Sequence, residues 1–234
     1  MLLLQGKYMK LSCCVIYTKG DDLISWRKSL PLDGIEVVAL EVRFDPSLDE
    51  IKQEVIGLTD SLKGLAITFP NQEDYFDFSL CRNLLDEYAD GEWIFHMDSD
   101  ERLAIPHDEF WTFIKAIDQA GADAAYVSIA GITKERKTSE MVEQRYNLAN
   151  MRLHRKSSGI KWSGICHETL DISKGGITTA DTDILLYHKG YSVDEDDFQK
   201  KLIRNAKLLV REYMREKSER NWTYLVRTFS LIKI

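Results

Sequence analysis

The fold class is decided by residues 91–102, which read GEWIFHMDSDER. The apolar run from Trp93 to Met97 predicts a short buried strand, and two carboxylates follow it where the strand reaches the surface. Side chains alternate along an extended chain, so Asp98 and Asp100 are expected to point the same way and to bind one divalent cation. Such a cation could hold a diphosphate. A plain polar turn is the alternative for an isolated Asp-x-Asp, so the surrounding sequence has to decide.

Strand and helix patterns alternate on both sides of this stretch. Strands are predicted at residues 10–17, 35–42, 64–69, 93–97 and 124–132. Helices are predicted at residues 23–30, 48–58, 77–89 and 106–120. This α/β alternation is typical of a parallel sheet whose two faces are covered by helices. Ligands of such sheets bind beyond the carboxyl ends of the strands, so the loops at Thr18, Glu41 and Asp98 are expected to converge.

The rest of the chain divides into a less regular part and a helical end. Residues 134–143 are highly charged and lack apolar periodicity, which predicts a mobile excursion over the site. A further strand pattern covers residues 183–187. A long amphipathic helix is predicted from Val193, and a second from Asn221 to the end. We therefore expect a main domain at residues 1–192 and a C-terminal helical extension at residues 193–234.

The composition limits the class of protein. With 234 residues, of which 44% are hydrophobic, the chain can build one sizeable core. Its net charge of -7 at pH 7 argues against a surface devoted to binding nucleic acid. The four cysteines, at positions 13, 14, 81 and 166, follow neither a zinc nor a disulfide spacing, which favours a reducing, cytoplasmic location. No stretch is long and apolar enough to predict a membrane span.

Six short motifs follow one another in a specific order and spacing. They are FSLCRN at 78–83, ADGEWI at 89–94, DSDE at 98–101, RLHR at 152–155, WSGICHE at 162–168 and HKGY at 188–191. This series resembles family 2 glycosyltransferases of the GT-A fold, and within them a bacterial and phage branch. The resemblance extends over about the whole chain. It implies a Rossmann-like, mostly parallel sheet with flanking helices and additional C-terminal helices.

The resemblance also implies inverting transfer of a sugar from a nucleotide sugar with the help of Mn²⁺ or Mg²⁺. Asp100 would contact the metal directly, Asp98 would bind the donor ribose or reach the metal through water, and His188 would be the third ligand. Taken alone, a histidine at the end of a strand is more typical of a hydrogen-bonded structural residue. The donor-binding set is expected to comprise Tyr17, Thr18, Lys19, Glu41, Asp45, Arg82, Asp98 and Ser99.

Transfer by inversion needs a group that takes the acceptor proton while the diphosphate leaves on the opposite side. Glu168 is the candidate general base and His167 is the runner-up, whereas a charged loop tip is the structural alternative for the pair. Arg82 would hold the diphosphate or the base through its planar guanidinium, or it would simply pair with a carboxylate near the start of its helix. Trp162 is expected to contact the acceptor or, alternatively, to form core or pocket wall.

The donor base and the acceptor follow less directly. Relatives usually carry an aspartate at the end of the second strand, where this chain has Glu41, and Asp45 could substitute for it. Either carboxylate can accept the imide hydrogen of uracil, so a uridine diphosphate sugar is the expected donor. The acceptor is open between a glycan or lipid core, a peptide, and a modified base in phage DNA. For DNA, residues 134–137 and 152–161 would form a basic lip.

Two other classes of function are alternatives. A non-catalytic scaffold protein would bind a nucleotide sugar without forming product, but such a binder has no use for a base such as Glu168. A nucleotidyltransferase also combines carboxylates with a metal on an α/β sheet. It would need a glycine-rich phosphate loop after the first strand, and TKGD at residues 18–21 is a poor match.

Overall fold

The computed structural model describes residues 9–31, 33–59, 61–70, 76–134, 141–173, 175–188 and 195–232. In chain order the elements are β1 (Leu11–Tyr17), α1 (Leu23–Lys28), β2 (Ile35–Phe44), β3 (Lys52–Leu58), β4 (Leu62–Phe69), α2 (Phe78–Tyr88), β5 (Trp93–His96), β6 (Glu101–Leu103), α3 (His107–Gln119), β7 (Ala124–Lys134), β8 (Met141–Arg155), the 3₁₀ turn η1 (Lys156–Ser158), β9 (Trp162–Ser163), β10 (Thr169–Leu170), β11 (Thr179–His188), α4 (Glu195–Arg215) and α5 (Glu219–Phe229).

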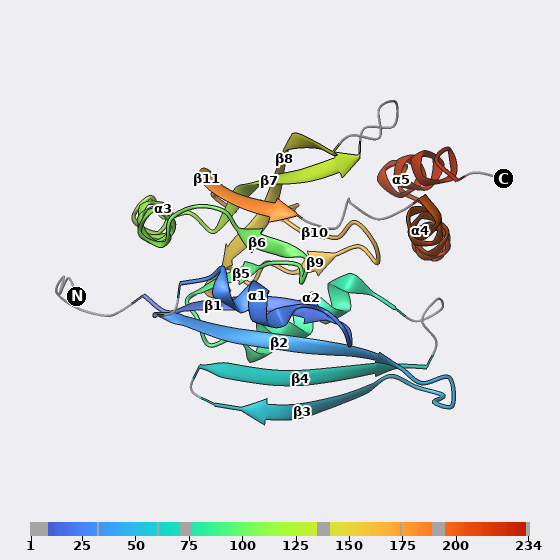
Figure 1. Ribbon diagram of the computed structural model, residues 1–234, viewed down its shortest axis with the longest axis horizontal. Helices are drawn as coiled ribbons and strands as arrows, with labels where there is room; N and C mark the ends of the chain where they lie inside the picture. Colours follow the sequence, from blue (N-terminus) through green and yellow to red (C-terminus); the bar gives the residue numbers. More distant parts are fainter. Residues whose placement is uncertain are drawn as a thin grey trace.

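The central sheet has nine strands in the order β3-β4-β2-β1-β5-β8-β7-β11-β6, with helices flanking it (Figure 1). Strands β4, β2, β1, β5, β7 and β11 run in one direction, and β3, β8 and β6 run in the other. The sheet is therefore mostly parallel, as predicted. Because β2 lies on one side of β1 and β5 on the other, the carboxyl ends of β1 and β5 form a topological switch point, where open sheets bind ligands.

Helices cover both faces of the middle part of this sheet. One core packs α1 and α3 against the sheet, and a second core packs α2, α4 and α5 against the opposite face. Cys13 belongs to the first core and Cys14 to the second, because neighbouring side chains of a strand point to opposite faces. Such a strand needs apolar residues in succession, which explains the unbroken run that predicted β1.

One predicted helix is wrong. Residues 52–58 of the segment expected to be helical form strand β3, which pairs antiparallel with β4 at the edge of the sheet. All residues of β3 are exposed, so the apolar spacing in this segment does not mark a buried helix face. The β-branched Val55 and Ile56 favour extended backbone, and Gly57 disfavours a helix interior.

The charged segment at residues 134–143 also differs from expectation. Strand β7 continues to Lys134, and β8 starts at Met141 and pairs antiparallel with it. Residues 135–140, where most of the predicted excursion falls, lie outside the described residues, as do Gly190 and Tyr191 of the HKGY motif. Strand β8 was not predicted, because polar residues interrupt the apolar pattern in its first half.

The two C-terminal helices are confirmed as helices, and both contact the core of the sheet. Leu208 and Leu209 of α4 and Leu225 of α5 are buried in the core that α2 also covers. The two helices lie side by side at the end of the molecule toward which the parallel strands point (Figure 1). They therefore stand next to the loops that follow those strands. The division of the chain at residue 192 stays a prediction, and none of the described helices is long and apolar enough to cross a membrane.

Gly91 provides a test of this packing, because the chain that enters β5 passes directly against β1. A Cβ atom at Gly91 would lie 2.4 Å from the backbone nitrogen of Ser12 and 2.6 Å from the carbonyl oxygen of Trp93. Gly91→Ala should therefore lower the free energy of unfolding by about 1–3 kcal/mol, the usual cost of overpacking. Chemical denaturation measures this change.

Gly57→Ala in the edge strand is the matched control. A Cβ atom there would meet no atom within 4 Å, so the free energy of unfolding should stay within about 0.5 kcal/mol of wild type. A Gly91→Ala protein that unfolds at the wild-type denaturant midpoint would contradict the packing described at β1 and β5.

Candidate active site

The two aspartates of the DSDE motif lie in a turn at the switch point. This turn leaves β5 and enters β6, which pairs antiparallel with β11 so that Glu101 lies opposite His188. The expectation of an extended Asp-x-Asp is therefore wrong, because the two residues occupy a turn and their side chains have different partners. Asp98 contacts arginines, whereas Asp100 contacts a histidine.

Arg82 joins the first motifs to the WSGICHE loop. This α2 residue is 2% exposed, its Nη2 donates to Asp98 Oδ1 at 2.7 Å, and its Nε donates to Glu168 Oε1 at 2.7 Å. Glu168 is 86 residues away in sequence, yet one guanidinium holds it beside Asp98. Of the two roles expected for Arg82, the structure shows the pairing with carboxylates.

Arg152 of β8 completes this ion-pair network, whereas the sequence had indicated it only as part of the RLHR motif and of a basic lip. Its Nη2 lies 2.9 Å from Asp98 Oδ2 and 3.0 Å from Glu101 Oε1, while Glu101 Oε2 accepts the backbone N–H of Asp98 at 2.8 Å. Burial disfavours the Asp98 carboxylate, but Arg152 and Arg82 outweigh this and hold its pKa well below the usual range. Burial raises the pKa of Glu101, and Arg152 acts in the opposite direction.

Asp100 and His188 form a second contact, and these are the residues of the site best able to hold a cation. His188 Nε2 lies 3.2 Å from Asp100 Oδ2, with the two side chains 11% and 41% exposed. Burial lowers the pKa of His188, but the hydrogen bond to Asp100 and the nearby carboxylates outweigh it, so the net direction is upward. Oxygen and imidazole donors suit Mn²⁺. Asp98 fits a direct metal contact less well, because arginines occupy both of its carboxylate oxygens.

The loop that carries Glu168 is held by the two C-terminal helices. Glu212 of α4 accepts the backbone N–H groups of Ile165 and Cys166, and Arg220 of α5 donates to the carbonyl oxygen of His167 at 2.7 Å. Gly164 has a φ of 103°, which explains a glycine at this position of the motif. The loop and the helices are thus one structural unit, which the sequence pattern did not indicate.

His167 and Glu168 point to different surroundings. The His167 ring stacks on Tyr224 of α5 at a centroid distance of 4.8 Å, and His167 has a φ of 58°, which is uncommon for a residue with a side chain. Burial lowers the pKa of His167. Glu168 instead contacts Arg82 and through it Asp98. Of the two candidate bases, Glu168 is therefore the one within the ion-pair network.

Trp162 does not meet the expectation of an acceptor contact. It is 5% exposed, and the guanidinium of Arg82 lies over its ring at 4.7 Å from the centroid. His96 contacts the same ring at 4.9 Å between centroids. The tryptophan therefore packs against Arg82 inside the protein, which agrees with the alternative expectation of a core or pocket-wall residue.

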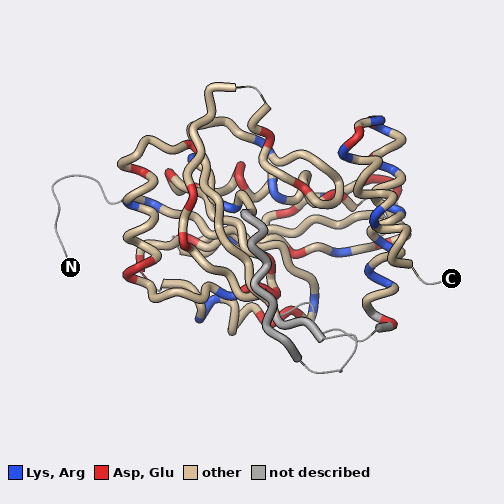
Figure 2. Tube along the Cα trace, turned by 90° about the horizontal axis from the view of Figure 1, so that it is seen from above, with Lys and Arg blue, Asp and Glu red and all other residues tan. Residues whose placement is uncertain are grey.

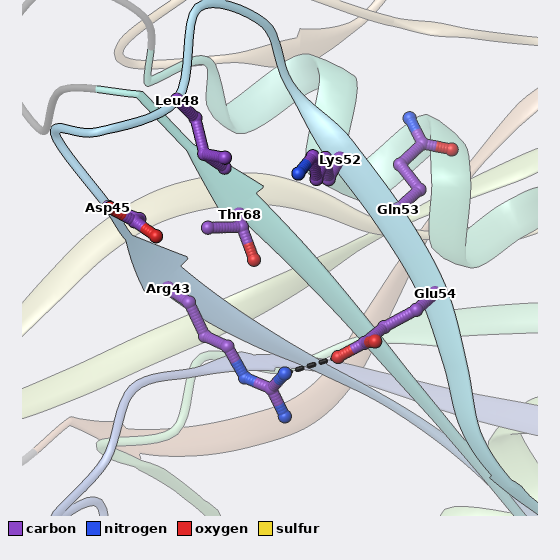
Figure 3. Close-up of a pocket in the computed structure, with 7 residues that line it drawn as sticks. All are labelled: Arg43, Asp45, Leu48, Lys52, Gln53, Glu54 and Thr68. Atoms are coloured by element: carbon purple, nitrogen blue, oxygen red, sulfur yellow. Dashed lines mark hydrogen bonds and ion pairs between the residues drawn. The ribbon is translucent and has the colours of Figure 1, made fainter.

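Three of the predicted donor residues, Tyr17, Glu41 and Asp45, lie at or just after the ends of β1 and β2. Tyr17 and Glu41 are opposite each other in the parallel pairing of these strands. Glu41 accepts from Arg43 at 2.7 Å, whereas Asp45 accepts from the backbone N–H of Ser47 at 2.9 Å. A cavity of about 410 Å³ lies where β2 and β4 end and β3 begins (Figure 3), and it is lined by Arg43, Asp45, Leu48, Lys52, Gln53, Glu54 and Thr68.

The first loop and the DSDE turn carry the other expected donor residues. The backbone N–H of Thr18 donates to Asp21 at 2.8 Å, so this loop closes as a tight turn next to the exposed Lys19. The carbonyl oxygen of Ser99 accepts from Arg102 at 2.8 Å. These contacts order the two loops, and Arg102 joins them by donating to the carbonyl oxygen of Asp22 at 3.2 Å, in line with the predicted convergence of these loops.

Three of the four lysines and arginines at residues 152–161 have partners within the protein. Arg152 is engaged in the ion-pair network, Arg155 pairs with Asp118 at 2.7 Å, and Lys156 donates to the carbonyl oxygen of Ala89. Along the tube of the chain, basic and acidic residues are interspersed, including on α4 and α5 (Figure 2). The described residues therefore give no support to a DNA-binding edge, and residues 135–137 lie outside them.

Comparisons with known proteins gave matches in structure alone. No protein-family model and no curated protein matches the chain. The crystal structure of S. aureus TarS is similar, with 14% identity and a TM-score of 0.46, over 96% of this chain and 44% of that one. Complexes of TarS 1–349 with UDP and with UDP-GlcNAc are similar at 16% identity, with TM-scores of 0.45 and 0.44, over 86% of this chain and 66% and 67% of theirs.

The chain thus spans less than half of the longer TarS chain. With TM-scores below 0.5, these similarities do not extend to activity or ligands, and an assignment has to rest on this chain's own residues.

Removal of Arg82 tests the ion-pair network. Arg82→Met should lower the free energy of unfolding at pH 7 by about 3 kcal/mol, because two carboxylates lose a buried cation. This value is at the low end for a buried pair, since Asp98 is 38% exposed and water screens it. Arg43→Met is the control. It removes a 40% exposed arginine that pairs with two carboxylates, and it should lower the free energy of unfolding by less than about 1 kcal/mol.

The cost should also depend on pH. Arg152 and Arg82 lower the pKa of Asp98 in the folded state. The stability that Asp98 gains from its arginine partners is therefore fully present above its pKa in the unfolded chain, and it is lost as the pH falls toward its pKa in the folded protein. The difference between wild type and Arg82→Met should therefore shrink below about pH 4. A difference that grows on acidification would contradict this assignment.

Proposed function

We propose that the protein is a metal-dependent, inverting glycosyltransferase that uses a nucleotide sugar, with a uridine diphosphate sugar as the expected donor. One observation carries the proposal: Arg82 contacts both Asp98 and Glu168, next to the pair formed by Asp100 and His188. Residues that the motifs implied for donor, metal and proton transfer thus lie together at the switch point of the sheet, where an α/β fold binds its ligand.

The donor would lie across the ends of β1, β2 and β5. Tyr17, Thr18 and Lys19 leave β1 on one side of this edge, and Asp98 and Ser99 leave β5 on the other. Glu41 is paired with Arg43, whereas Asp45 lines a cavity. Asp45 is therefore the better candidate to accept the imide hydrogen of uracil.

The metal site of the proposal consists of Asp100 and His188. A bound Mn²⁺ or Mg²⁺ would supply charge neutralisation to the leaving diphosphate, worth several kcal/mol in such reactions. Asp98 would keep its arginine partners and orient the donor ribose. Arg82 and Arg152 fix the orientation of the Asp98 carboxylate, because each donates to one of its oxygens.

Glu168 is proposed as the general base. In an inverting transfer the acceptor hydroxyl oxygen forms a bond to the anomeric carbon while the bond to the diphosphate oxygen breaks. The hydroxyl proton passes to the carboxylate at the same time. Arg82 holds Oε1 of Glu168, so Oε2 would receive this proton. The contacts of the loop with α4 and α5 would hold the base in position.

Calorimetric measurement of nucleotide binding tests the proposed donor and metal site separately from the transfer reaction. Uridine, guanosine and cytidine diphosphates are titrated with Mn²⁺ and with a chelator, into wild type, Asp100→Asn and Asp108→Asn. We expect one nucleotide to bind in the presence of Mn²⁺, and this binding to be lost in Asp100→Asn with the fold retained. Asp108→Asn removes an exposed carboxylate in the first turn of α3 and should bind as wild type. Failure of all three nucleotides to bind would contradict the proposal.

Substitution of the base distinguishes an enzyme from a binding scaffold. Glu168→Gln should retain metal-dependent nucleotide binding and lower the rate of sugar transfer roughly 10²–10⁴-fold, the usual contribution of a general base. Transfer is measured as labelled sugar moved from uridine diphosphate sugars to a panel of glycan, lipid-linked and peptide acceptors. Wild-type turnover by Glu168→Gln would contradict the role of Glu168 and leave His167 to test. Binding without transfer by wild type across the panel would favour the scaffold.

A further inference from the structure

A second group of titratable side chains lies beneath the ion-pair network and has no part in the proposed transfer. Cys14, Asp86, His96 and His154 come from β1, α2, β5 and β8, and each is at most 5% exposed. We call these four residues the buried histidine cluster. Trp162 closes one side of it through its contact with His96.

The strand register explains why the cluster forms. Cys14 lies opposite His96 in the parallel pairing of β1 and β5, and His154 lies opposite Ile94 in the antiparallel pairing of β5 and β8. Residues two apart on a strand share a face. The thiol and both imidazoles therefore point to the α2 side of the sheet, where Asp86 meets them.

The potential ligand atoms are close together. The thiol of Cys14, a carboxylate oxygen of Asp86 and a ring nitrogen of His96 all lie within 4.8 Å of one another. His96 Nε2 is 2.6 Å from Asp86 Oδ1, and His154 Nε2 is 3.3 Å from Asp86 Oδ2. Ligand atoms around a tetrahedral Zn²⁺ are separated by roughly 3.3–3.8 Å, given bonds of about 2.0–2.3 Å. Small side-chain shifts would bring Cys14, Asp86 and His96 to that spacing, and His154, which contacts this group through Asp86, would turn toward the ion as the fourth ligand.

Among the described residues, four polar atoms of the cluster lack a well-formed hydrogen bond: Asp86 Oδ2, His96 Nδ1, His154 Nδ1 and His154 Nε2. Asp86 Oδ2 and His154 Nε2 lie 3.3 Å from each other, so the two Nδ1 atoms are the unsatisfied ones. Leaving buried polar atoms unsatisfied is costly, so these two indicate a missing partner. Burial lowers the pKa of His96 to about 4, which leaves its imidazole neutral and able to donate a lone pair at pH 7.

We propose that Cys14, Asp86, His96 and His154 bind a structural Zn²⁺. One sulfur, one carboxylate oxygen and two imidazole nitrogens form a four-coordinate donor set that suits this ion. The ion would connect β1, α2, β5 and β8, the elements that carry Tyr17, Arg82, Asp98 and Arg152 to the carboxyl edge. This site is separate from Asp100 and His188, and it holds whether or not the protein transfers sugar.

Metal uptake is expected to accompany folding. Because Cys14 is buried and the thiolate is the form that binds metal, its proton must be released to solvent as the ion binds. All four ligands are then enclosed, and the ion should not exchange during dialysis of the folded protein. The readily exchanged cation expected at Asp100, which is 41% exposed, would behave differently.

The first experiment measures zinc by elemental analysis after production in zinc-supplemented medium, dialysis and gel filtration. Wild type and Asp100→Asn should carry about one zinc per chain. Cys14→Ser should lose most of it, whereas Cys81→Ser, which alters a buried thiol of α2 outside the cluster, should keep it. Zinc that is absent from folded wild type, or is lost in Asp100→Asn and kept in Cys14→Ser, would overturn the proposal.

The second experiment needs no variant, in case Cys14→Ser does not fold. Wild type is produced with cobalt in place of zinc, and its absorption spectrum is recorded. The proposal predicts a near-ultraviolet charge-transfer band from thiolate to Co²⁺, together with intense visible bands of tetrahedral coordination. A folded protein that contains no cobalt, or cobalt without the thiolate band, would overturn it.

Discussion

The structure depends on one buried cation, the guanidinium of Arg82. An arginine that is 2% exposed is tolerated only if carboxylates meet it, because removing its charge from water costs several kcal/mol. Asp98 and Glu168 meet this requirement from a strand end and from a distant loop, and Trp162 lies against the guanidinium. Three segments far apart in sequence are thereby fixed relative to α2, and their geometry defines the site.

The charges around Arg82 explain why some carboxylates of the site pair with arginines while Asp100 contacts a histidine. Arg82 and Arg152 together face Asp98, Glu101 and Glu168, so each of these three acidic groups has an arginine partner. Asp100 is the carboxylate of the DSDE turn whose partner is instead a histidine, and its side chain is 41% exposed. An exposed oxygen donor beside an imidazole can take up a cation without breaking the network, which is the basis for the proposed metal site.

Much of the fold could be predicted from the sequence where local signals agree with packing. Apolar residues in succession indicated β1, and Asp77, whose side chain caps α2, marked the start of that helix. Residues 48–58 misled because their apolar spacing fits a helix, although β3 is held by pairing with β4 at the sheet edge. Strand β8 has no clear apolar pattern of its own. It is held by antiparallel pairing with β5 and β7, and this pairing cannot be read from local sequence.

The proximity of the candidate site residues was predicted in part, for a similar reason. Motif order gave Asp98, Asp100, Glu168 and His188, whose proximity at the carboxyl edge follows from a parallel sheet. The role of Arg152 depends on a three-dimensional contact that no spacing reveals. The buried histidine cluster likewise depends on contacts in three dimensions, because its four members come from four separate elements. Cysteine spacing, which argued against a zinc site, does not detect such a cluster.

The most direct test of the central claim is a crystal structure of the protein grown with uridine diphosphate and Mn²⁺, with anomalous data at the manganese absorption edge. The account predicts an anomalous peak in contact with Asp100 and His188, and a nucleotide across the ends of β1, β2 and β5. A manganese ion bound elsewhere, or a nucleotide bound away from this edge, would contradict it.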